Sequence, residues 1–179
     1  MPKLIENAPQ QLLAEARRQV VERGYAKTTI RSVAGACGIA VGTVYNYFPS
    51  KESLIASFVA EDWKKSLAAM GERNRENGED CLRTIYEELL AFTRKHQTLF
   101  TDPDAAKAVS GALLGRHLQL REQLAHLIEP FAPSADGFTA RFIAEALLTW
   151  TISNTPFERI YQELKKLISD QKEELHEQL

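Results

Sequence analysis

The stretch TTIRSVAGACGIAVGTVYNYFPSKESL, residues 28–54, decides the fold of this 179-residue chain. Its first half places small and apolar residues on one face of a short helix, at Ile30, Val33, Ala34 and Cys37. Gly38 follows, and a residue without a Cβ readily takes the left-handed conformation that ends a helix. Ile39 is an apolar residue directly after this turn. The pattern therefore predicts a short helix that ends in a tight turn.

A second short helix is predicted over residues 41–48. Val44 and Phe48 lie four positions apart, so they point inward together. The opposite face carries the polar groups of Thr43, Asn46 and Tyr47. Pro49 ends this helix, and the run Ser-Lys-Glu-Ser at 50–53 predicts the cap of a third helix. Two short helices around a turn form a helix-turn-helix, and the polar face of the second helix suits a DNA major groove.

Residues 10–54 resemble the DNA-binding domain of the TetR/AcrR family of transcriptional regulators. The motifs that carry the resemblance keep its order and spacing: Gly24-Tyr25, Thr28-Thr29, Val33-Ala34, Cys37-Gly38-Ile39, Val41-Gly42-Thr43-Val44-Tyr45, Tyr47-Phe48 and Ser50-Lys51-Glu52-Ser53-Leu54. The resemblance implies an all-α fold. A three-helix helix-turn-helix domain is expected over residues 1–54, followed by a helical effector-binding and dimerisation domain over residues 55–179.

The resemblance also implies which residues contact DNA. Carried over position by position, they are Thr28, Thr29, Arg31, Ala40, Val41, Gly42, Thr43, Tyr45, Asn46, Tyr47 and Lys51. Thr43 and Asn46 can hydrogen-bond to base edges, and Gly42 lets the backbone approach the DNA closely. Tyr45 and Tyr47 offer hydroxyl groups to phosphates, although partial burial is the alternative for either ring.

The other residues expected to contact DNA differ from one another in their chemistry. One of Thr28 and Thr29 is expected to cap the helix that follows, and a free threonine hydroxyl there can bind a phosphate. Lys51 brings positive charge to a helix N-terminus, and Arg31 can reach a phosphate. Val41 departs from the family, which often has a lysine there, so one expected phosphate contact is missing and the salt dependence of binding should be weaker.

Composition indicates an ordinary globular protein, with 44% hydrophobic and 26% charged residues and a net charge of −2. The charge is uneven, because residues 1–57 carry a net +3 and the remainder a net −5, which suits phosphate contact by the N-terminal part. The two cysteines, Cys37 and Cys81, show neither a pairing pattern nor metal-ligand spacing. Without a signal pattern or membrane-length apolar run, the sequence predicts a soluble cytoplasmic protein with no metal or cofactor.

Beyond the motif, the sequence predicts further helices and no strand of useful length. Their apolar patterns span residues 51–70, 81–99, 105–128, 138–153 and 157–179. The helix that begins at Lys51 would join the DNA-binding part to the rest, as in the family.

Two wide apolar faces near the C-terminus predict a homodimer interface. The expected residues are Phe138, Phe142, Trp150, Phe157, Ile160, Leu164, Leu167 and Ile168. The alternative is that the last helix packs only within its own subunit. A two-fold dimer would set two recognition helices about 34 Å apart, in successive major grooves of a palindromic operator.

The resemblance implies that the helical body binds a small effector. Candidate lining residues are Trp63, Leu67, Met70, Tyr86, Leu89, Phe92, His96, Phe100, Leu113, His117 and Leu120. For any one of them ordinary core packing is the alternative, and for His96 and His117 a surface position. The mixture indicates an apolar or aromatic ligand, and the pocket is expected to be small or filled.

The sequence can be interpreted as one of three classes of protein: a regulator, an enzyme or an interaction protein. The favoured one is a ligand-responsive transcriptional repressor, because repression is the usual mode of the family that the chain resembles, although the sequence does not rule out activation. An enzyme is disfavoured, because the four histidines form no i, i+4 pair and the chain has no Gly-rich phosphate loop or paired carboxylates. The third is an interaction protein that keeps the fold but has lost or altered DNA binding, for which Val41 is the single hint.

Overall fold

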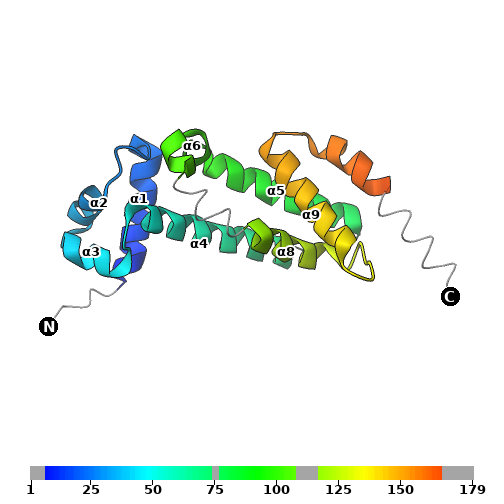
Figure 1. Ribbon diagram of the computed structural model, residues 1–179, viewed down its shortest axis with the longest axis horizontal. Helices are drawn as coiled ribbons and strands as arrows, with labels where there is room; N and C mark the ends of the chain where they lie inside the picture. The colour runs from blue at the N-terminus through cyan, green and yellow to red at the C-terminus, as the bar shows by residue number, and fades with distance from the viewer. Residues whose placement is uncertain (1–6, 74–76, 108–116, 167–179) are drawn as a thin grey trace. The chain divides into compact units, whose positions relative to one another are not determined.

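The computed structural model describes residues 7–73, 77–107 and 117–166 of the chain. Within these ranges every regular element is a helix (Figure 1). In chain order they are α1 (Ala8–Arg23), α2 (Ile30–Cys37), α3 (Val41–Tyr47), α4 (Lys51–Glu72), α5 (Gly78–Lys95), α6 (Gln97–Thr101), α8 (His117–Ile128) and α9 (Phe138–Ile152). Residues 103–107 and 157–166 are also helical. The predicted all-α class is confirmed, and no helix in the described part is long and apolar enough to cross a membrane.

The chain divides into two compact units. The N-terminal unit comprises Met1–Asp62 and His96–Gly115, and the C-terminal unit comprises Trp63–Lys95 and Arg116–Leu179. The division falls within α4, so this one helix contributes to both cores. It also assigns α6 to the N-terminal unit, an addition that the sequence did not predict.

The N-terminal unit is built on α1, whose apolar stripe faces the two short helices. Buried side chains come from each of its labelled helices: Leu12, Leu13, Ala16, Val20, Ile30, Val33, Ala34, Val44, Leu54, Ile55, Phe58 and, in α6, Leu99. Asn7 lies at the start of α1 with φ 64°, and its side chain makes no capping hydrogen bond. Pro9 occupies the first turn, where its missing N–H costs no hydrogen bond, and Gly24 ends the helix with φ 82°. Most of the folding energy of this unit therefore comes from burying the apolar faces of short helices.

The C-terminal unit has an apolar core formed by α5, α8, α9 and the C-terminal part of α4. Fully buried members are Met70, Cys81, Leu82, Ile85, Leu124, Ile128, Ile143, Ala144 and Leu147. Helix α5 has a sharply amphipathic sequence and places Leu82, Ile85 and Leu89 on the core side. Helix α9 has one buried face and one exposed face, and the exposed face carries aromatic side chains.

The helical residues 157–166 correct one expectation about the dimer interface. Phe157, Ile160 and Leu164 were expected to face a partner subunit, yet they are 3%, 6% and 3% exposed within the chain's own core. The centroid of the Phe157 ring lies 5.5 Å from that of the Tyr86 ring and 4.2 Å from the Arg83 guanidinium. Side chains covered in this way offer almost no surface to a second chain. The other two expected residues of this helix, Leu167 and Ile168, lie outside the described residues.

Candidate nucleic-acid interface

Helix α2 is fixed at its start by a reciprocal cap. The Thr29 hydroxyl accepts a hydrogen bond from the Ser32 amide at 3.0 Å, and the Ser32 hydroxyl oxygen accepts one from the Thr29 amide at 3.0 Å. Thr29 therefore fills the predicted capping role. Thr28 is 1% exposed, and its hydroxyl donates to the Gly24 carbonyl at 2.9 Å. This burial corrects the expectation that Thr28 contacts DNA, because its one hydroxyl is turned into the chain.

The turn between α2 and α3 has the predicted geometry. Gly38 takes the left-handed conformation with φ 67°, and its amide and that of Ile39 donate to the last carbonyls of α2. Ala40 is extended and starts α3. Val44 is fully buried and Phe48 is 7% exposed, so the predicted inward direction of both side chains is confirmed.

The remaining side chains of α3 face outward from this anchor. Tyr45 is 51% exposed, Asn46 is exposed, and Thr43 and Tyr47 are half-buried. Ala40, Gly42 and Arg31 are also exposed, and Val41 is half-buried. A Cβ built on Gly42 would meet no described atom within 4 Å, so packing inside the chain does not demand glycine there. Apart from Thr28, the residues expected to contact DNA are thus brought onto accessible positions of α2, α3 and the start of α4.

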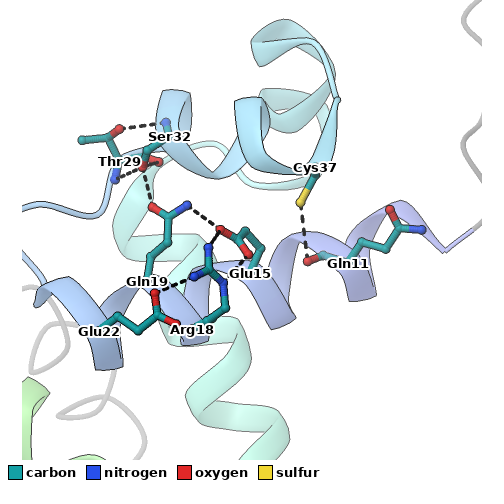
Figure 2. Close-up of polar contacts among 8 residues, drawn as sticks. All are labelled: Gln11, Glu15, Arg18, Gln19, Glu22, Thr29, Ser32 and Cys37. Atoms are coloured by element: carbon teal, nitrogen blue, oxygen red, sulfur yellow. Dashed lines mark hydrogen bonds and ion pairs between the residues drawn. The ribbon is translucent and has the colours of Figure 1, made fainter.

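A polar cluster that the sequence did not reveal joins α1 to α2. Figure 2 shows Gln19 between the two helices, where its amide oxygen accepts from the Ser32 hydroxyl at 2.6 Å and its amide nitrogen donates to Glu15 at 2.7 Å. Gln19 is 1% exposed, and each of these bonds satisfies a group removed from water. Arg18 donates to both Glu15 oxygens, at 2.9 and 2.6 Å, and this contact lowers the pKa of Glu15. The signal in the sequence was a glutamine seven residues after Leu12, on the apolar face of α1.

Cys37 makes a separate contact between α2 and α1 (Figure 2), as a half-buried thiol rather than a fully buried one. Its Sγ lies 3.7 Å from the Gln11 carbonyl oxygen, and burial raises the pKa of the thiol. A raised pKa keeps the sulfur protonated and unreactive, which agrees with the packing role expected for it.

Lys51 is held against the chain at the start of α4. Its ammonium donates to the Tyr25 carbonyl at 2.6 Å and lies 3.5 Å from the centroid of the Tyr25 ring. Burial lowers the pKa of Lys51, and it raises the pKa of Tyr25 to about 12, helped by the hydrogen bond from the Tyr25 hydroxyl to Glu52. These contacts tie the segment after α1 to the helix after α3, so Lys51 has a structural role beside the DNA contact predicted for it.

A largely buried polar cluster links three helices of the N-terminal unit. Arg17 of α1 donates to Asp62 of α4 at 2.9 Å, and Nε2 of His96, at the start of α6, lies 3.2 Å from the other Asp62 oxygen. Asp62 and His96 are each 3% exposed, and the Phe58 ring stacks on the His96 ring at 6.2 Å. This position corrects the expectation for His96, which is neither a surface residue nor a member of the helical body.

The residues expected to line an effector pocket are divided between the units. His96 and Phe100 belong to the N-terminal unit, whereas the described remainder belongs to the C-terminal unit: Trp63, Leu67, Met70, Tyr86, Leu89, Phe92, His117 and Leu120. Leu113 lies outside the described residues. Met70 and Leu89 are core residues, and the Trp63 indole donates to Gln123 at 2.8 Å with its ring edge-on to Phe92. The half-buried Leu67, Tyr86 and Phe92 pack against the same core.

Comparison with known proteins places these features in context. Residues 12–58 match the family described as bacterial regulatory proteins, tetR family. The chain is 27% identical over 128 residues to the fatty acid metabolism regulator protein of Bacillus subtilis, covering 71% of this chain and 63% of that protein. It is 32% identical over 98 residues to the HTH-type transcriptional repressor AcnR of Corynebacterium diphtheriae, covering 55% and 48%. The chain thus spans less than two thirds of the length of either relative.

Solved structures show the same fold over most of the chain. A transcriptional regulator from Rhodococcus sp. Rha1 superposes with a TM-score of 0.58 at 17% identity, covering 92% of this chain and 93% of that one. A TetR-like transcriptional regulator from Rhodococcus sp. RHA1 gives a TM-score of 0.52 at 22% identity, covering 93% and 96%. At these identities the likeness concerns the architecture, and it agrees with the arrangement of helices described above.

Proposed function

We propose that this chain, which belongs to the tetR family of bacterial regulatory proteins, is a repressor that binds a palindromic operator as a homodimer and leaves it when a small effector binds. The observation that carries the proposal is the arrangement of α3. Val44 anchors the helix while Thr43, Tyr45 and Asn46 remain accessible on its outer side. A short helix of this kind, held by a glycine turn, presents base-reading groups to a major groove.

Gly42 supports a close approach of α3 to DNA. Nothing described within 4 Å of a Cβ at this position would oppose a larger residue, and the backbone there is helical. The missing side chain of Gly42 therefore matters on the outer surface of α3, where it lets the helix backbone lie close to the nucleic acid. Gly42→Leu is expected to leave folding intact and to weaken DNA binding.

A homodimer supplies the specificity that one α3 lacks. A seven-residue helix reaches few base edges, whereas two copies read two half-sites. Helix α9 provides an exposed face for this pairing, with Phe138 at 60%, Phe142 at 49% and Trp150 at 52% exposure. Large aromatic side chains gathered on one exposed helix face favour a protein partner.

An apolar effector fits the C-terminal unit. Its half-buried aromatic residues Tyr86 and Phe92 pack against an apolar core that also contains the buried rings of Trp63 and Phe157. One relative is named for the regulation of fatty acid metabolism, which makes a fatty-acid-like ligand the first class to test. A ligand at a hundred times its dissociation constant would raise the free energy of unfolding by about 2.7 kcal/mol.

The first experiment measures binding of the purified chain to DNA from the region upstream of its own gene. Fluorescence anisotropy over a range of salt concentrations should show sequence-dependent binding that weakens as salt rises. Asn46→Ala and Tyr45→Ala together should reduce the affinity at least tenfold, whereas Gln162→Ala, an exposed amide in residues 157–166, should leave it unchanged. Binding that ignores the double substitution would refute the role of α3, and a folded dimer without DNA affinity would favour the interaction protein instead.

The effector is tested by adding decanoic acid or benzoate to the preformed complex. Release of DNA together with a raised melting temperature would support an apolar effector. If neither compound changes the anisotropy or the melting temperature while DNA binding persists, the fatty-acid-like class is excluded and the DNA-binding part of the proposal stands.

A further inference from the structure

Three consecutive hydrogen bonds run from α1 to the first turn of α2 (Figure 2). Glu15 accepts from Nε2 of Gln19 at 2.7 Å, and Oε1 of Gln19 accepts from the Ser32 hydroxyl at 2.6 Å. The Ser32 oxygen in turn accepts from the Thr29 amide at 3.0 Å. We refer to these four residues as the Gln19 relay. It connects a carboxylate on α1 to the backbone at the cap of α2.

The carboxylate of Glu15 sets the direction of the relay. Arg18 donates to both of its oxygens, at 2.9 and 2.6 Å, and this contact lowers the pKa of Glu15. At neutral pH the carboxylate is therefore ionised and can only accept hydrogen bonds. The Gln19 amide must turn its nitrogen toward Glu15, which leaves its oxygen for α2.

Gln19 occupies a position where an apolar side chain would be ordinary. It follows Leu12 and Ala16 along the buried face of α1, and all three are at most 1% exposed. Burial of an amide costs free energy unless its polar atoms are hydrogen-bonded, and here both ends of the amide are. An unbranched apolar residue of similar size would fill the same space without this requirement.

The fold depends little on this amide, because each of its partners has another contact. The Ser32 hydroxyl also lies 2.9 Å from the Thr29 carbonyl oxygen, and Glu15 keeps its bonds from Arg18. What the amide adds is direction. Apolar burial is non-directional, whereas a hydrogen bond restricts both distance and angle. The contact between Gln19 and Ser32 therefore limits the rotation of α2 on α1 more than the surrounding apolar packing does.

The relay ends beside a residue expected to contact DNA. Thr29 is exposed, and its hydroxyl oxygen accepts from the Ser32 amide at 3.0 Å, so its hydrogen can be donated outward. At the other end of α2 the contact with α1 is weaker, since Sγ of Cys37 lies 3.7 Å from the Gln11 carbonyl oxygen. Helix α2 continues through the Gly38 turn into α3. A rotation of α2 would therefore move the Thr29 hydroxyl and α3 together.

We propose that Gln19 is a positioning residue for DNA binding, whose amide fixes the rotation of α2 through Ser32 so that Thr29 and α3 meet the DNA together. The inference rests on the DNA binding of the proposed function. Without the amide, the N-terminal unit stays folded but α2 takes several orientations, because a core that loses a specific contact loses its unique arrangement before its stability.

Gln19→Met tests this role, since methionine keeps the unbranched shape and removes both hydrogen bonds. Fluorescence anisotropy with the DNA upstream of the gene should show an affinity lower by about fivefold or more, the equivalent of one lost hydrogen bond. Hydrogen-exchange protection of the α1 amides, which reports the stability of the unit, should change by less than about threefold. Gln162→Met makes the same chemical change at an exposed position of residues 157–166 and should alter neither quantity.

A double-mutant cycle tests whether Gln19 acts through Ser32. Ser32→Ala should itself weaken DNA binding, because it removes the middle of the relay. Adding Gln19→Met to Ser32→Ala should then change the affinity by less than about twofold. If the two losses instead multiply, the two residues act independently, and the proposed path through Ser32 is wrong.

The same measurements separate this inference from the proposed function. If the unmodified chain binds the DNA and Gln19→Met binds it equally well, the positioning role is overturned and the proposed function stands. A loss of α1 protection as large as the loss of affinity would also overturn it, because Gln19 would then only hold the unit together. If the unmodified chain binds no DNA, the proposed function and the positioning role both fail.

Discussion

Helices α3 and α9 each have a buried side and an exposed side, but they are held in place by different forces. Helix α3 buries one residue of its own, Val44, and is positioned by polar contacts at its borders and by the helices beside it. Helix α9 buries six residues and is held by apolar packing. An exposed helix face can therefore be supported either by polar contacts with neighbouring segments or by apolar packing of the opposite face. Apolar truncations should therefore damage α9 most, and polar truncations should damage the support of α3.

The largest effect is expected from Leu147→Ala on the buried side of α9. Leu147 is fully buried, so its truncation should lower the free energy of unfolding of the C-terminal unit by about 3 kcal/mol. Both tryptophans of the chain, Trp63 and Trp150, belong to this unit, and their fluorescence during urea unfolding reports its stability. Ile152→Ala on the exposed side is the matched control, with a loss below about 0.5 kcal/mol in dilute protein. Equal losses for the two variants would contradict the two-sided description of α9.

The second effect concerns the polar support of α2 and α3. Gln19→Ala removes one of the two acceptors of the Ser32 hydroxyl and the donor to Glu15, and should cost the N-terminal unit about 1–2 kcal/mol. Hydrogen exchange at the amides of α2 measures this loss, and DNA affinity should fall with it. Glu22→Ala, which removes an exposed partner of Arg18, is the control and should cost less than about 1 kcal/mol. If α2 exchanges no faster in Gln19→Ala, the cluster does not support the motif.

The third effect depends on pH and concerns the contact beside the end of α3. The pKa of Tyr25 is raised to about 12 from its usual value of 10, so the folded state holds this proton more tightly than the unfolded state. Its stabilising contribution is complete below pH 10 and is lost as the pH rises through 12. Urea unfolding between these two pH values should show falling stability, and Tyr25→Phe should reduce the slope. The same slope in Tyr25→Phe and in the unmodified chain would show that other groups cause it.

The smallest effect on stability is expected on the exposed side of α3. Tyr45 is 51% exposed, so Tyr45→Ala should change the unfolding free energy by less than about 0.5 kcal/mol. Its DNA affinity should nevertheless fall severalfold, which anisotropy would measure. Val44→Ala, one residue earlier, should instead mainly lower the free energy of unfolding, because Val44 is fully buried. A marked loss of stability in Tyr45→Ala would mean that this ring supports the fold.

Much of the helix-turn-helix could be predicted because its determinants are local. Thr29 and Ser32 form a cap over three residues, Gly38 takes the left-handed conformation, and Val44 and Phe48 share a face four residues apart. Each feature follows from backbone geometry within one or two helical turns. The burial of Thr28 was not predictable in the same way, since the sequence offers two adjacent threonines and one cap.

The remaining features depend on segments far apart in the chain. Sequence spacing showed that Phe157, Ile160 and Leu164 share a face, but it could not tell whether that face meets the chain's own α5 or a partner. His96 had no nearby carboxylate in sequence, and its contact with Asp62 bridges 34 residues. Gln19 and Ser32 meet across 13 residues and two helices.

The sequence by itself determined the helical class and the helix-turn-helix, because periodicity, caps and turn residues act over a few positions. Only the tertiary structure decided which apolar faces are already covered, where the buried side chains of Asp62 and His96 meet, and which face of α9 stays exposed. Burial is a property of the neighbours that the fold supplies. A stripe of apolar residues in the sequence indicates that this face of the helix must be covered. Which segment or chain covers it depends on the folded structure.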